Sequence, residues 1–280
     1  MLEVRKMKKG KFHIMVNGLP GNMASLIFMR LLENPSYCLL DHSLTGPDST
    51  RETFRLSTIL HKPPYHEKIL SSISAEHEDN LIAIDFTQPA GIMENARLYC
   101  EHKIPFVMGT TGGDREALST MVENSEISAV IAPNMSVPIV ILMNMLSYAA
   151  DLYPHSLQNW RLRIVESHQK KKADVSGTAI AIGKIFNSMG VKYSDTNIRS
   201  VRDTVEQRLM GIPPENIKGH GWHQYSLLSP DGSVQLGFEH NVNGRNTYVD
   251  GTILALAFLA KEIKEGSAGQ CFSMQEVLQG

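Results

Sequence analysis

The stretch "VNGLPGNMAS", residues 16–25, decides how the N-terminal half of this chain folds. An apolar run before it predicts a buried strand over 12–18, and "NMASLIFMRLLEN" after it predicts a helix over 22–34. Gly18 and Gly21 lie between them. In a dinucleotide-binding turn such glycines let backbone amides approach a pyrophosphate at the helix N-terminus. G-x-x-G also occurs in plain glycine turns, so its position between strand and helix is what favours cofactor binding.

The alternation of strand and helix continues to about residue 136. Strands are predicted over 37–43, 81–87, 104–113 and 127–136, with helices over 91–103 and 115–125. This rhythm predicts a parallel sheet with right-handed crossovers. We therefore expect a doubly wound, Rossmann-like N-terminal domain, although the polar segment 47–80 predicts only one helix, over 65–73.

Two further strand ends are rich in turn residues: "GTT" (109–111) and "APNMS" (132–136). Each alone is explained by ordinary turn chemistry. Ligands of open α/β sheets bind outside the carboxyl ends of the strands. Together with the glycine turn, these loops predict one shared crevice.

The pattern changes after residue 150. "WRLRIVESH" (160–168) alternates like a half-buried strand, and "GTAIAIGKIFNSMG" (177–190) is an amphipathic helix closed by a glycine. Residues 221–242 predict a hairpin around Ser-Pro-Asp-Gly, and 251–266 predict a strongly apolar helix. We expect a second, α+β domain with an open, mixed and largely antiparallel sheet.

Composition excludes several classes of protein. The chain has 280 residues, 42% of them hydrophobic, and a net charge of −2, so it lacks the overall positive charge of a nucleic-acid-binding protein. Its three cysteines show no CxxC spacing, so neither a metal site nor a disulfide framework is predicted. No apolar run reaches the length of a membrane span, and no signal peptide follows the basic first residues. We expect a cytoplasmic protein.

"VESHQKKKADVSGTA", residues 165–179, carries the most distinctive chemistry. His168 and Lys172 share a face if this stretch is extended, and they meet at i, i+4 if it is helical. Neighbouring lysines disfavour a protonated histidine, and a dicarboxylate substrate would reverse that effect. Ser176, Gly177 and Thr178 offer amides and hydroxyls at a helix start. The alternative is a solvated basic loop followed by an ordinary helix cap.

This stretch resembles the signature of the dihydrodipicolinate reductase family, roughly E-x-H-x-x-x-K-x-D-x-SGTA. "VNGLPGNM", "IDFTQP", "VMGTTGGDR", "APNMS" and "EHNVNGR" also match in order and spacing. The likeness covers most of the chain and is greatest to the plant-type branch. It implies an enzyme that uses NADPH or NADH to reduce a cyclic imine dicarboxylate, 4-hydroxy-tetrahydrodipicolinate or dihydrodipicolinate, to tetrahydrodipicolinate on the diaminopimelate route to lysine.

The resemblance also assigns roles to residues. His168 resembles the general acid, and Lys172 the second catalytic residue, which stabilises charge beside it. Gln169, Ser176, Gly177 and Thr178 correspond to substrate-binding positions. Gln169 stands where many bacterial members have a second histidine, and "DVSGTA" is one residue shorter than their common form. The cofactor-binding positions are Gly18, Leu19, Pro20, Gly21, Asn22, Met23, Ser43, Thr87, Gly109, Thr110, Thr111, Ala132, Pro133, Asn134 and Met135.

Preference between the two cofactors depends on the second predicted strand. Asp41 lies twenty residues after Gly21, where an acid would bind the ribose 2′-hydroxyl of NADH. Ser43 and Thr45 could instead hold the 2′-phosphate of NADPH, and plant-type members have a serine there. We expect NADPH, with NADH possible.

The resemblance sets the domain organisation as well. Residues 1–133 and 247–280 are expected to form the dinucleotide-binding domain, because the family returns its last helix there. Residues 134–246 are expected to bind substrate and to assemble a homodimer or homotetramer.

Two alternative functions remain open from the sequence. Another two-domain dehydrogenase, such as aspartate-semialdehyde dehydrogenase, needs a nucleophilic cysteine, and Cys100 lies within a predicted helix without an activating neighbour. A catalytically silent nucleotide-binding regulator would keep the fold but not turn over, and the presence of both His168 and Lys172 disfavours it.

Overall fold

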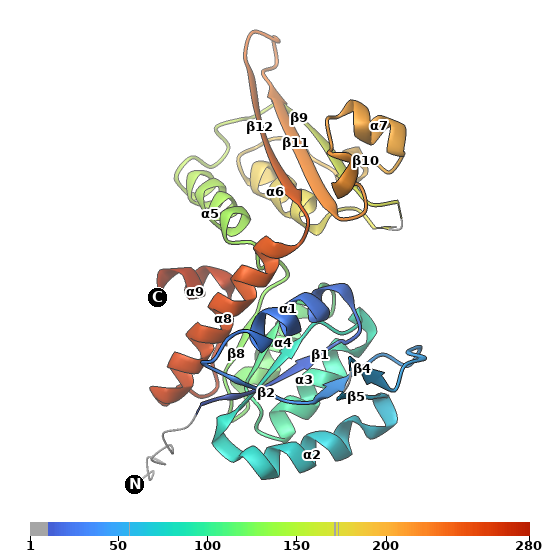
Figure 1. Ribbon diagram of the computed structural model, residues 1–280. Coiled ribbons are helices and arrows are strands. Elements are labelled where there is room, and N and C mark those ends of the chain that lie inside the picture. Colours follow the sequence, from blue (N-terminus) through green and yellow to red (C-terminus); the bar gives the residue numbers. More distant parts are fainter. Residues whose placement is uncertain (1–10, 56, 171, 173) are drawn as a thin grey trace. The chain divides into compact units, whose positions relative to one another are not determined.

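The computed structural model describes residues 11–55, 57–170, 172 and 174–280. Over these residues the chain forms a six-stranded, a four-stranded and a small three-stranded sheet with their helices (Figure 1). The neighbouring strands of the six-stranded sheet are all parallel, whereas the four-stranded sheet is mixed. The expected fold class, a Rossmann-like domain followed by an α+β domain with an open mixed sheet, is confirmed.

The parallel sheet has the strand order β13-β8-β7-β6-β1-β2. Its strands are β1 (His13–Asn17), β2 (Cys38–Leu39), β6 (Leu81–Asp85), β7 (Phe106–Met108), β8 (Ala129–Ile131) and β13 (Cys271–Phe272). β1 lies between β2 and β6, so the strand order reverses there, as in a doubly wound sheet. Because parallel strands end at one edge, the loops after β1, β6, β7 and β8 lie along the same edge.

Helices cover this sheet. They include α1 (Asn22–Leu32), α2 (His66–His77), α3 (Ile92–Glu101) and α4 (Arg115–Glu123). Met15, Phe106 and Met108 of the strands pack with α2, α3 and α4 in one apolar core. Strand residues at alternate positions, such as Ile14 and Ile84, are equally buried. Both faces of the sheet are therefore covered, which explains why its strands are continuous apolar runs.

The second predicted strand, over 37–43, is wrong as a single element. β2 pairs with β1, whereas β3 (His42–Leu44) pairs with β5 in the three-stranded sheet. At the break, the carbonyl of Asp41 accepts a hydrogen bond of 2.7 Å from the amide of Ile59. An apolar run does not show where a strand changes its partner.

The polar segment 47–80 contains more structure than its sequence predicts. The predicted helix is present as α2, and β4 (Thr53–Phe54) and β5 (Thr58–His61) precede it. These short strands pair in the order β3-β5-β4. They are two and four residues long, too short for a recognisable alternation of apolar and polar residues.

The mixed sheet has the strand order β10-β9-β11-β12. Its strands are β9 (Arg161–His168), β10 (Ile198–Val201), β11 (His220–Leu228) and β12 (Gln235–Asn243). β11 and β12 form the predicted antiparallel hairpin, and Asp231 in its turn accepts hydrogen bonds from Ser229 and Ser233. β10, which the sequence did not reveal, pairs with β9 in parallel.

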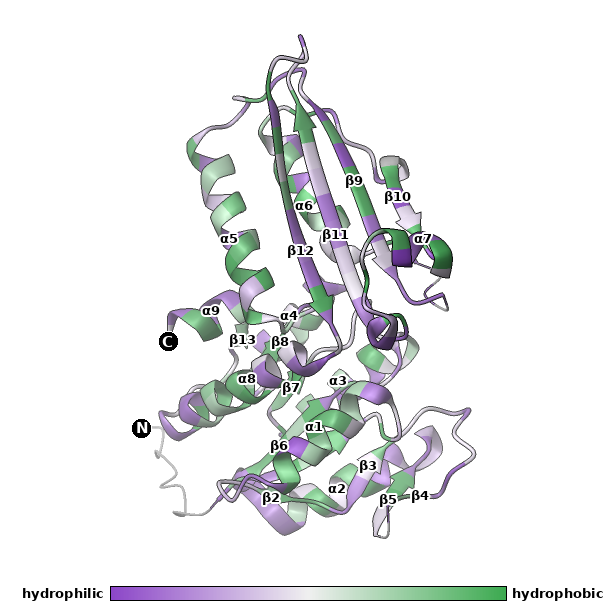
Figure 2. Cartoon of the chain, turned by 45° about the horizontal axis from the view of Figure 1, so that its top comes forward, coloured by the Kyte–Doolittle hydropathy of each residue, from purple (hydrophilic) through white to green (hydrophobic). Residues whose placement is uncertain are grey.

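Helices pack against the mixed sheet. They are α5 (Val137–Leu152), α6 (Gly177–Ser188) and the short α7 (Thr204–Leu209). Ile182 and Phe186 of α6 pack with Ile164 of β9 and Tyr225 of β11 in a second apolar core. α5 is coloured as hydrophobic over much of its length (Figure 2), although only part of it reaches this core.

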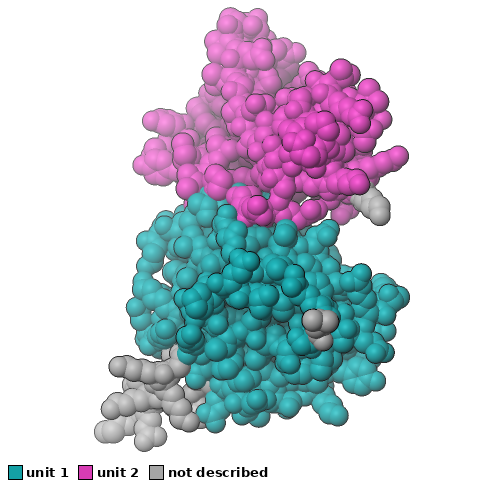
Figure 3. Space-filling model, in the orientation of Figure 1, with its two compact units in different colours: residues 1–137, 248–280 teal, residues 138–247 magenta. Residues whose placement is uncertain are grey.

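The chain divides into two compact units. Unit 1 comprises Met1–Val137 and Tyr248–Gly280, and unit 2 comprises Pro138–Thr247 (Figure 3). α8 (Asn246–Lys264), β13 and α9 (Met274–Gln279) bring the end of the chain back to unit 1. Within unit 1, a Cβ added to Gly251 of α8 would lie only 1.7 Å from the carbonyl oxygen of Met135, so glycine permits this close approach. The functions expected of the two segments remain predictions.

Candidate active site

The turn after β1 leaves the N-terminus of α1 open. Gly18 has φ +102°, a conformation that favours glycine. Gly21 is the N-cap residue, so no side chain caps α1, whereas Asp114 and Ser176 cap α4 and α6 with side-chain oxygens. A helix start with uncapped amides and a positive dipole end is what a diphosphate requires. The turn therefore fits a nicotinamide dinucleotide.

The other residues of this turn differ in accessibility. Pro20, Gly21 and Asn22 are exposed and Met23 is half-buried. Leu19 is fully buried, and its carbonyl accepts a 2.7 Å hydrogen bond from Thr45. Leu19 therefore supports the turn from its buried side.

Phe86, in the loop after β6, lies among three predicted cofactor loops. A Cβ on Gly18 would lie 2.3 Å from the carbonyl oxygen of Phe86, and one on Gly109 would lie 2.2 Å from its ring. Thr110 donates a 3.3 Å hydrogen bond to the carbonyl of Thr87. The loops after β1 and β7, two of the three predicted to share a crevice, thus both contact the loop after β6.

Asp85, the last residue of β6, organises these loops from within the core. Its carboxylate is fully buried and accepts hydrogen bonds from the amide and hydroxyl of Thr87 at 2.9 and 2.7 Å. The amide of Asn95 and the hydroxyl of Tyr99 donate at 2.9 and 2.8 Å. Burial, and to a smaller extent the neighbouring Asp85, raise the pKa of Tyr99, so its hydroxyl stays a neutral donor. No role for Asp85 was predicted from the sequence.

The loop after β8 completes this edge of the sheet. The amide of Ala132 donates to the carbonyl of Met108, at 3.0 Å, and the side chain of Asn134 accepts from the amide of Ser136, at 2.9 Å. Pro133 and, in the loop after β7, Thr111 are exposed. Their roles toward a cofactor stay predictions.

Ser43 is placed differently from what a 2′-phosphate ligand needs. It is fully buried, and its hydroxyl contacts the amide of Leu19 at 3.4 Å and the carbonyl of Leu44 at 3.2 Å. To reach a cofactor, the hydroxyl would have to leave both partners. Asp41, two residues earlier, is exposed.

His168 ends β9, and the chain turns immediately after it. The amide of Lys172 donates to the carbonyl of Gln169, at 2.9 Å, so the segment is neither the extended strand nor the helix considered for it. Lys170 is exposed, and Lys172 and Gln169 are half-buried. Both backbone shapes considered for this segment are therefore wrong, because the strand ends at the histidine, and the convergence of His168 and Lys172 stays a prediction. Lys171 and Ala173 lie outside the described residues.

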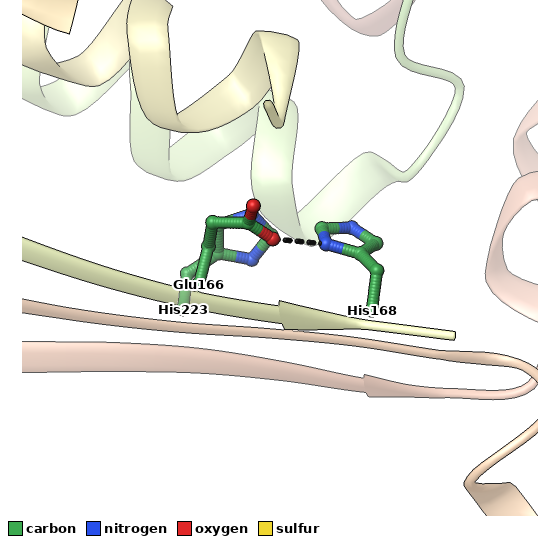
Figure 4. A group of neighbouring side chains, drawn as sticks. All are labelled: Glu166, His168 and His223. Atoms are coloured by element: carbon green, nitrogen blue, oxygen red, sulfur yellow. Dashed lines mark hydrogen bonds and ion pairs between the residues drawn. The ribbon is translucent and has the colours of Figure 1, made fainter. Parts of the chain in front are cut away.

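Glu166 is the close hydrogen-bonding partner of His168. The ring Nδ1 lies 2.5 Å from Oε2 of this fully buried glutamate (Figure 4). Arg202 binds both carboxylate oxygens, at 2.7 and 3.1 Å, and the hydroxyl of Ser200 donates at 2.5 Å. Burial alone would raise the pKa of Glu166, but the hydrogen bonds from His168, Arg202 and Ser200 outweigh it and lower the pKa to about 2.

Glu166, Ser200 and Arg202 were not predicted as site residues from the sequence. Glu166 belongs to the quoted signature and follows the two-residue alternation of β9 that also places His168, which was the available signal. Ser200 and Arg202 come from β10 and the residue after it, more than thirty positions away. Nothing in their local sequence links them to His168.

The predicted carboxylate seat lies at the start of α6. Ser176 caps the helix and is buried, and its hydroxyl lies 2.7 Å from Nε2 of His223 on β11. A Cβ on Gly177 would meet no atom within 4 Å, so there is open space beside this helix start. The ring centroids of His223 and His168 are 5.1 Å apart, which brings the seat and the histidine into one cluster.

Glu166, His168 and His223 also form a group whose ligand atoms lie within 4.8 Å of one another. Arg202, Ser200 and His168 already occupy the acceptor positions of the Glu166 carboxylate. A cation would have to displace them and would be repelled by the guanidinium. This group is therefore better explained as an ion-pair network than as a metal site.

Together, these features define a class of protein: a two-unit α/β oxidoreductase that uses a nicotinamide dinucleotide. The family model "Dihydrodipicolinate reductase, N-terminus" matches residues 12–135, and "Dihydrodipicolinate reductase, C-terminus" matches 138–278. The chain belongs to the dihydrodipicolinate reductase family. The resemblance noted in the sequence is confirmed, as is the expectation of an NAD(P)H-dependent oxidoreductase.

Similar proteins with curated names support this assignment. Chloroplastic 4-hydroxy-tetrahydrodipicolinate reductase 1 of Arabidopsis thaliana is 38% identical over 95% of this chain and 77% of its own length. The 4-hydroxy-tetrahydrodipicolinate reductase of Thermosynechococcus vestitus is 26% identical over 87% of this chain and 90% of its own. The greater likeness to a plant protein agrees with the plant-type motifs.

A solved structure shares the fold. The dipicolinate-bound dihydrodipicolinate reductase from Paenisporosarcina sp. TG-14 superposes with a TM-score of 0.63 at 19% identity, covering 94% of this chain and 98% of its own. An engineered D-amino acid dehydrogenase bound to NADP+ superposes with a TM-score of 0.52 at 14% identity, covering 95% of this chain and 94% of its own.

Proposed function

We propose that the chain reduces the cyclic imine dicarboxylate 4-hydroxy-tetrahydrodipicolinate, with loss of its hydroxyl as water, or dihydrodipicolinate, to tetrahydrodipicolinate in the diaminopimelate route to lysine. The single observation that carries this proposal is the cluster of His168 beside the Ser176–Gly177 helix start, in a chain that belongs to the reductase family. The helix start would hold a substrate carboxylate through backbone amides. Thr178 and Gln169 would add side-chain contacts.

Each proposed catalytic residue has a defined task. When bound, the reduced nicotinamide supplies the hydride. His168, with Nδ1 committed to Glu166, would supply from Nε2 the proton that balances it. The ammonium of Lys172 would stabilise negative charge that develops beside His168. In unit 1, the open start of α1 and the loops after β6, β7 and β8 would bind the cofactor.

The decisive experiment is a turnover assay with a matched binding measurement. We expect the wild-type chain to oxidise NADPH, followed at about 340 nm, in the presence of enzymatically made dihydrodipicolinate. His168→Ala should lose about 10²–10⁴-fold in kcat while its Kd for NADPH is unchanged, because the proton donor is removed and the cofactor unit is not. Unchanged kcat in this variant would refute the role of His168, and no turnover by the wild type would refute the reaction.

Cysteine chemistry bears on one alternative function, and the turnover assay tests the other. Burial raises the pKa of the Cys100 and Cys271 thiols, which disfavours the thiolate that a semialdehyde dehydrogenase needs. A catalytically silent regulator would bind NADPH in the same assay without oxidising it.

The preference for NADPH over NADH is a further part of the proposal. It depends on Ser43 and Thr45, which lie under the glycine turn with buried hydroxyls. If Ser43 turns toward a 2′-phosphate on binding, Ser43→Ala should weaken the binding of NADPH by roughly tenfold, because about one charge-assisted hydrogen bond is lost. The binding of NADH should be unchanged. Equal effects on both cofactors would show that Ser43 only supports the turn.

Assembly through unit 2 completes the proposal. Ile141, Met145, Tyr148 and Leu152 follow one another at helical spacing on α5 and are 47–67% exposed. An exposed apolar stripe of this kind is typical of a subunit interface. We expect a homodimer or homotetramer by light scattering, and Tyr148→Lys should dissociate it, whereas Leu209→Lys on α7 should not.

Cellular location is the coarsest part of the proposal. Among the helices built from described residues, none combines the length and apolarity needed to cross a bilayer. We propose a cytoplasmic enzyme without a nucleic-acid partner, although the names of the Arabidopsis relatives include "chloroplastic".

A further inference from the structure

We propose that Glu166 and Arg202 are positioning residues for both catalytic residues: Glu166 sets the tautomer and charge of His168, and Arg202 fixes Glu166 together with the loop that carries Lys172. This inference rests on the proposed function. Both residues act through others, since neither is placed here against the substrate.

The first step is the state of the His168 ring. With its pKa lowered to about 2, Glu166 is a carboxylate near neutral pH and can only accept a hydrogen bond. Nδ1 of His168, 2.5 Å from Oε2, must therefore carry a hydrogen. The proton given to a substrate can come only from Nε2. The negative charge beside Nδ1 also stabilises the imidazolium, the form that a general acid needs.

Two charged residues, Glu166 and Arg202, control the tautomer and charge of the His168 ring. The ring of His223 meets the ring of His168 edge to face, the ring of His240 stacks on that of His223, and His220 lies on the same strand as His223. Burial is the largest cause that lowers the pKa of each of these three histidines, to about 4 for His240, so they are neutral near pH 7. Lys170 and Lys172 follow His168 in the loop. Glu166 is thus the anion at the ring, with Arg202 as its counter-ion.

Arg202 keeps the buried carboxylate both ionised and oriented. Its Nη2 and Nη1 bind Oε1 and Oε2 of Glu166 at 2.7 and 3.1 Å, a fork that only a guanidinium provides. Removing the cation would leave a buried charge without its partner, which is strongly unfavourable.

The same guanidinium also binds the backbone at Lys172 and Asp174. Its Nε donates to the carbonyl of Lys172 at 2.9 Å, and Nη2 donates to the carbonyl of Asp174 at 3.2 Å. One side chain therefore connects the carboxylate behind His168 to the backbone of Lys172. A lysine at position 202 would keep the charge but could not make these contacts simultaneously, because it has one nitrogen.

The first experiment follows the His168 ring by NMR as pH is changed, without cofactor or substrate. Glu166→Gln should move the titration of the ring to lower pH by about one unit, because the anion is lost, and Arg202→Gln should move it to higher pH, because the cation is lost. Arg199→Gln is the matched control, since Arg199 lies on β10, three residues before Arg202, but pairs with Glu206 at the surface. The basic limb of the kcat profile should move in the same directions.

The opposite signs make this a test of positioning and charge, because a merely structural role would give no such pair of shifts. If Glu166→Gln and Arg202→Gln move the titration in the same direction, or if neither differs from Arg199→Gln, the inference is overturned. Thermal denaturation of each variant checks that it is folded.

The second experiment isolates the loop contact. Arg202→Lys keeps the positive charge, so the His168 titration should stay within a few tenths of a unit, but kcat should fall about tenfold through a misplaced Lys172. In a Lys172→Ala background, Arg202→Lys should cause little further loss, because the group that it positions is gone. If the losses in kcat from Arg202→Lys and Lys172→Ala were additive, or if Arg202→Lys had the same kcat as Arg199→Lys, the proposed positioning of Lys172 by Arg202 would be overturned. Activity of the wild type on dihydrodipicolinate keeps either failure distinct from failure of the proposed function.

Discussion

Asp85 in unit 1 and Glu166 in unit 2 are both fully buried carboxylates at or near the end of a strand, yet they are held differently. Asp85 accepts hydrogen bonds from a backbone amide, three hydroxyls and a side-chain amide, all neutral donors. Glu166 is held by an arginine, a histidine and one serine. The Asp85 carboxylate fixes the positions of the neutral groups that donate to it, whereas the Glu166 carboxylate controls the charge of the His168 ring.

This difference matches the chemistry proposed for each unit. A cofactor loop must present amides and hydroxyls at fixed positions, and the neutral network of Asp85 does this for Thr87 and Thr110. A proton donor must change its charge during the reaction, so its partner must tolerate both states. Glu166 does so because Arg202 compensates it throughout.

The largest expected effect comes from closing the glycine turn of unit 1. Gly18→Ala would force a side chain to φ +102° and place its Cβ 2.3 Å from a backbone oxygen. We expect the Kd for NADPH to rise at least about 100-fold, measured by calorimetry, because the turn must move to relieve this contact. Gly91→Ala, which has room for a Cβ, should bind normally. Normal binding by Gly18→Ala would contradict the assignment of the turn.

A smaller effect should separate the two carboxylates. Asp85→Asn replaces an acceptor with a donor where Asn95 and Tyr99 both donate, so one buried hydrogen bond is lost and the loops after β6 and β7 shift. The Kd for NADPH should rise about tenfold. Glu166→Gln, the corresponding change in unit 2, should leave this Kd within twofold. If both variants raise the Kd for NADPH equally, the two networks are not functionally separate.

The space beside His168 gives a third prediction. A Cβ on Gly221 would lie 3.2 Å from Nε2 of His168, which is tighter than an ordinary contact. Gly221→Ala should lower kcat several-fold, roughly 1 kcal/mol, by displacing the ring from the substrate, with the Kd for NADPH unchanged. The control is Gly237→Ala on the adjacent strand, where a Cβ would meet only an ordinary contact of 3.6 Å. Equal kcat values for the two variants would argue against a role for Nε2.

The smallest expected effect is on acid stability. The folded-state pKa of His240 is lowered from 6.5 to about 4, so the unfolded chain binds this proton first and unit 2 loses stability as pH falls from 6.5 to 4. The pKa of Glu166 is lowered from 4.5 to about 2, so unit 2 loses further stability as pH falls from 4.5 to 2. Trp160 and Trp222 both lie in unit 2, so tryptophan fluorescence reports its melting. His240→Gln should flatten the first slope, and an unchanged slope would rule out His240 as its cause.

The sequence by itself determined the parallel sheet, the hairpin and the family, because each depends on local pattern. Apolar runs mark strands that are buried on both faces, and Gly18 and Gly21 mark a turn that few other residues can form. The signature around His168 also identified both proposed catalytic residues. Short elements escaped prediction: β4, β10 and β13 have two to four residues and show no periodicity.

Only the tertiary structure decided which groups surround those residues. Sequence proximity suggested lysines as the neighbours of His168, and it did not reveal that Glu166, two residues before it, is the buried partner of the ring. Arg202 comes from more than thirty residues away, because β10 pairs with β9 in parallel. Charges act through space and burial, which a chain acquires only on folding, so the electrostatics of this site could not be predicted from the order of its residues.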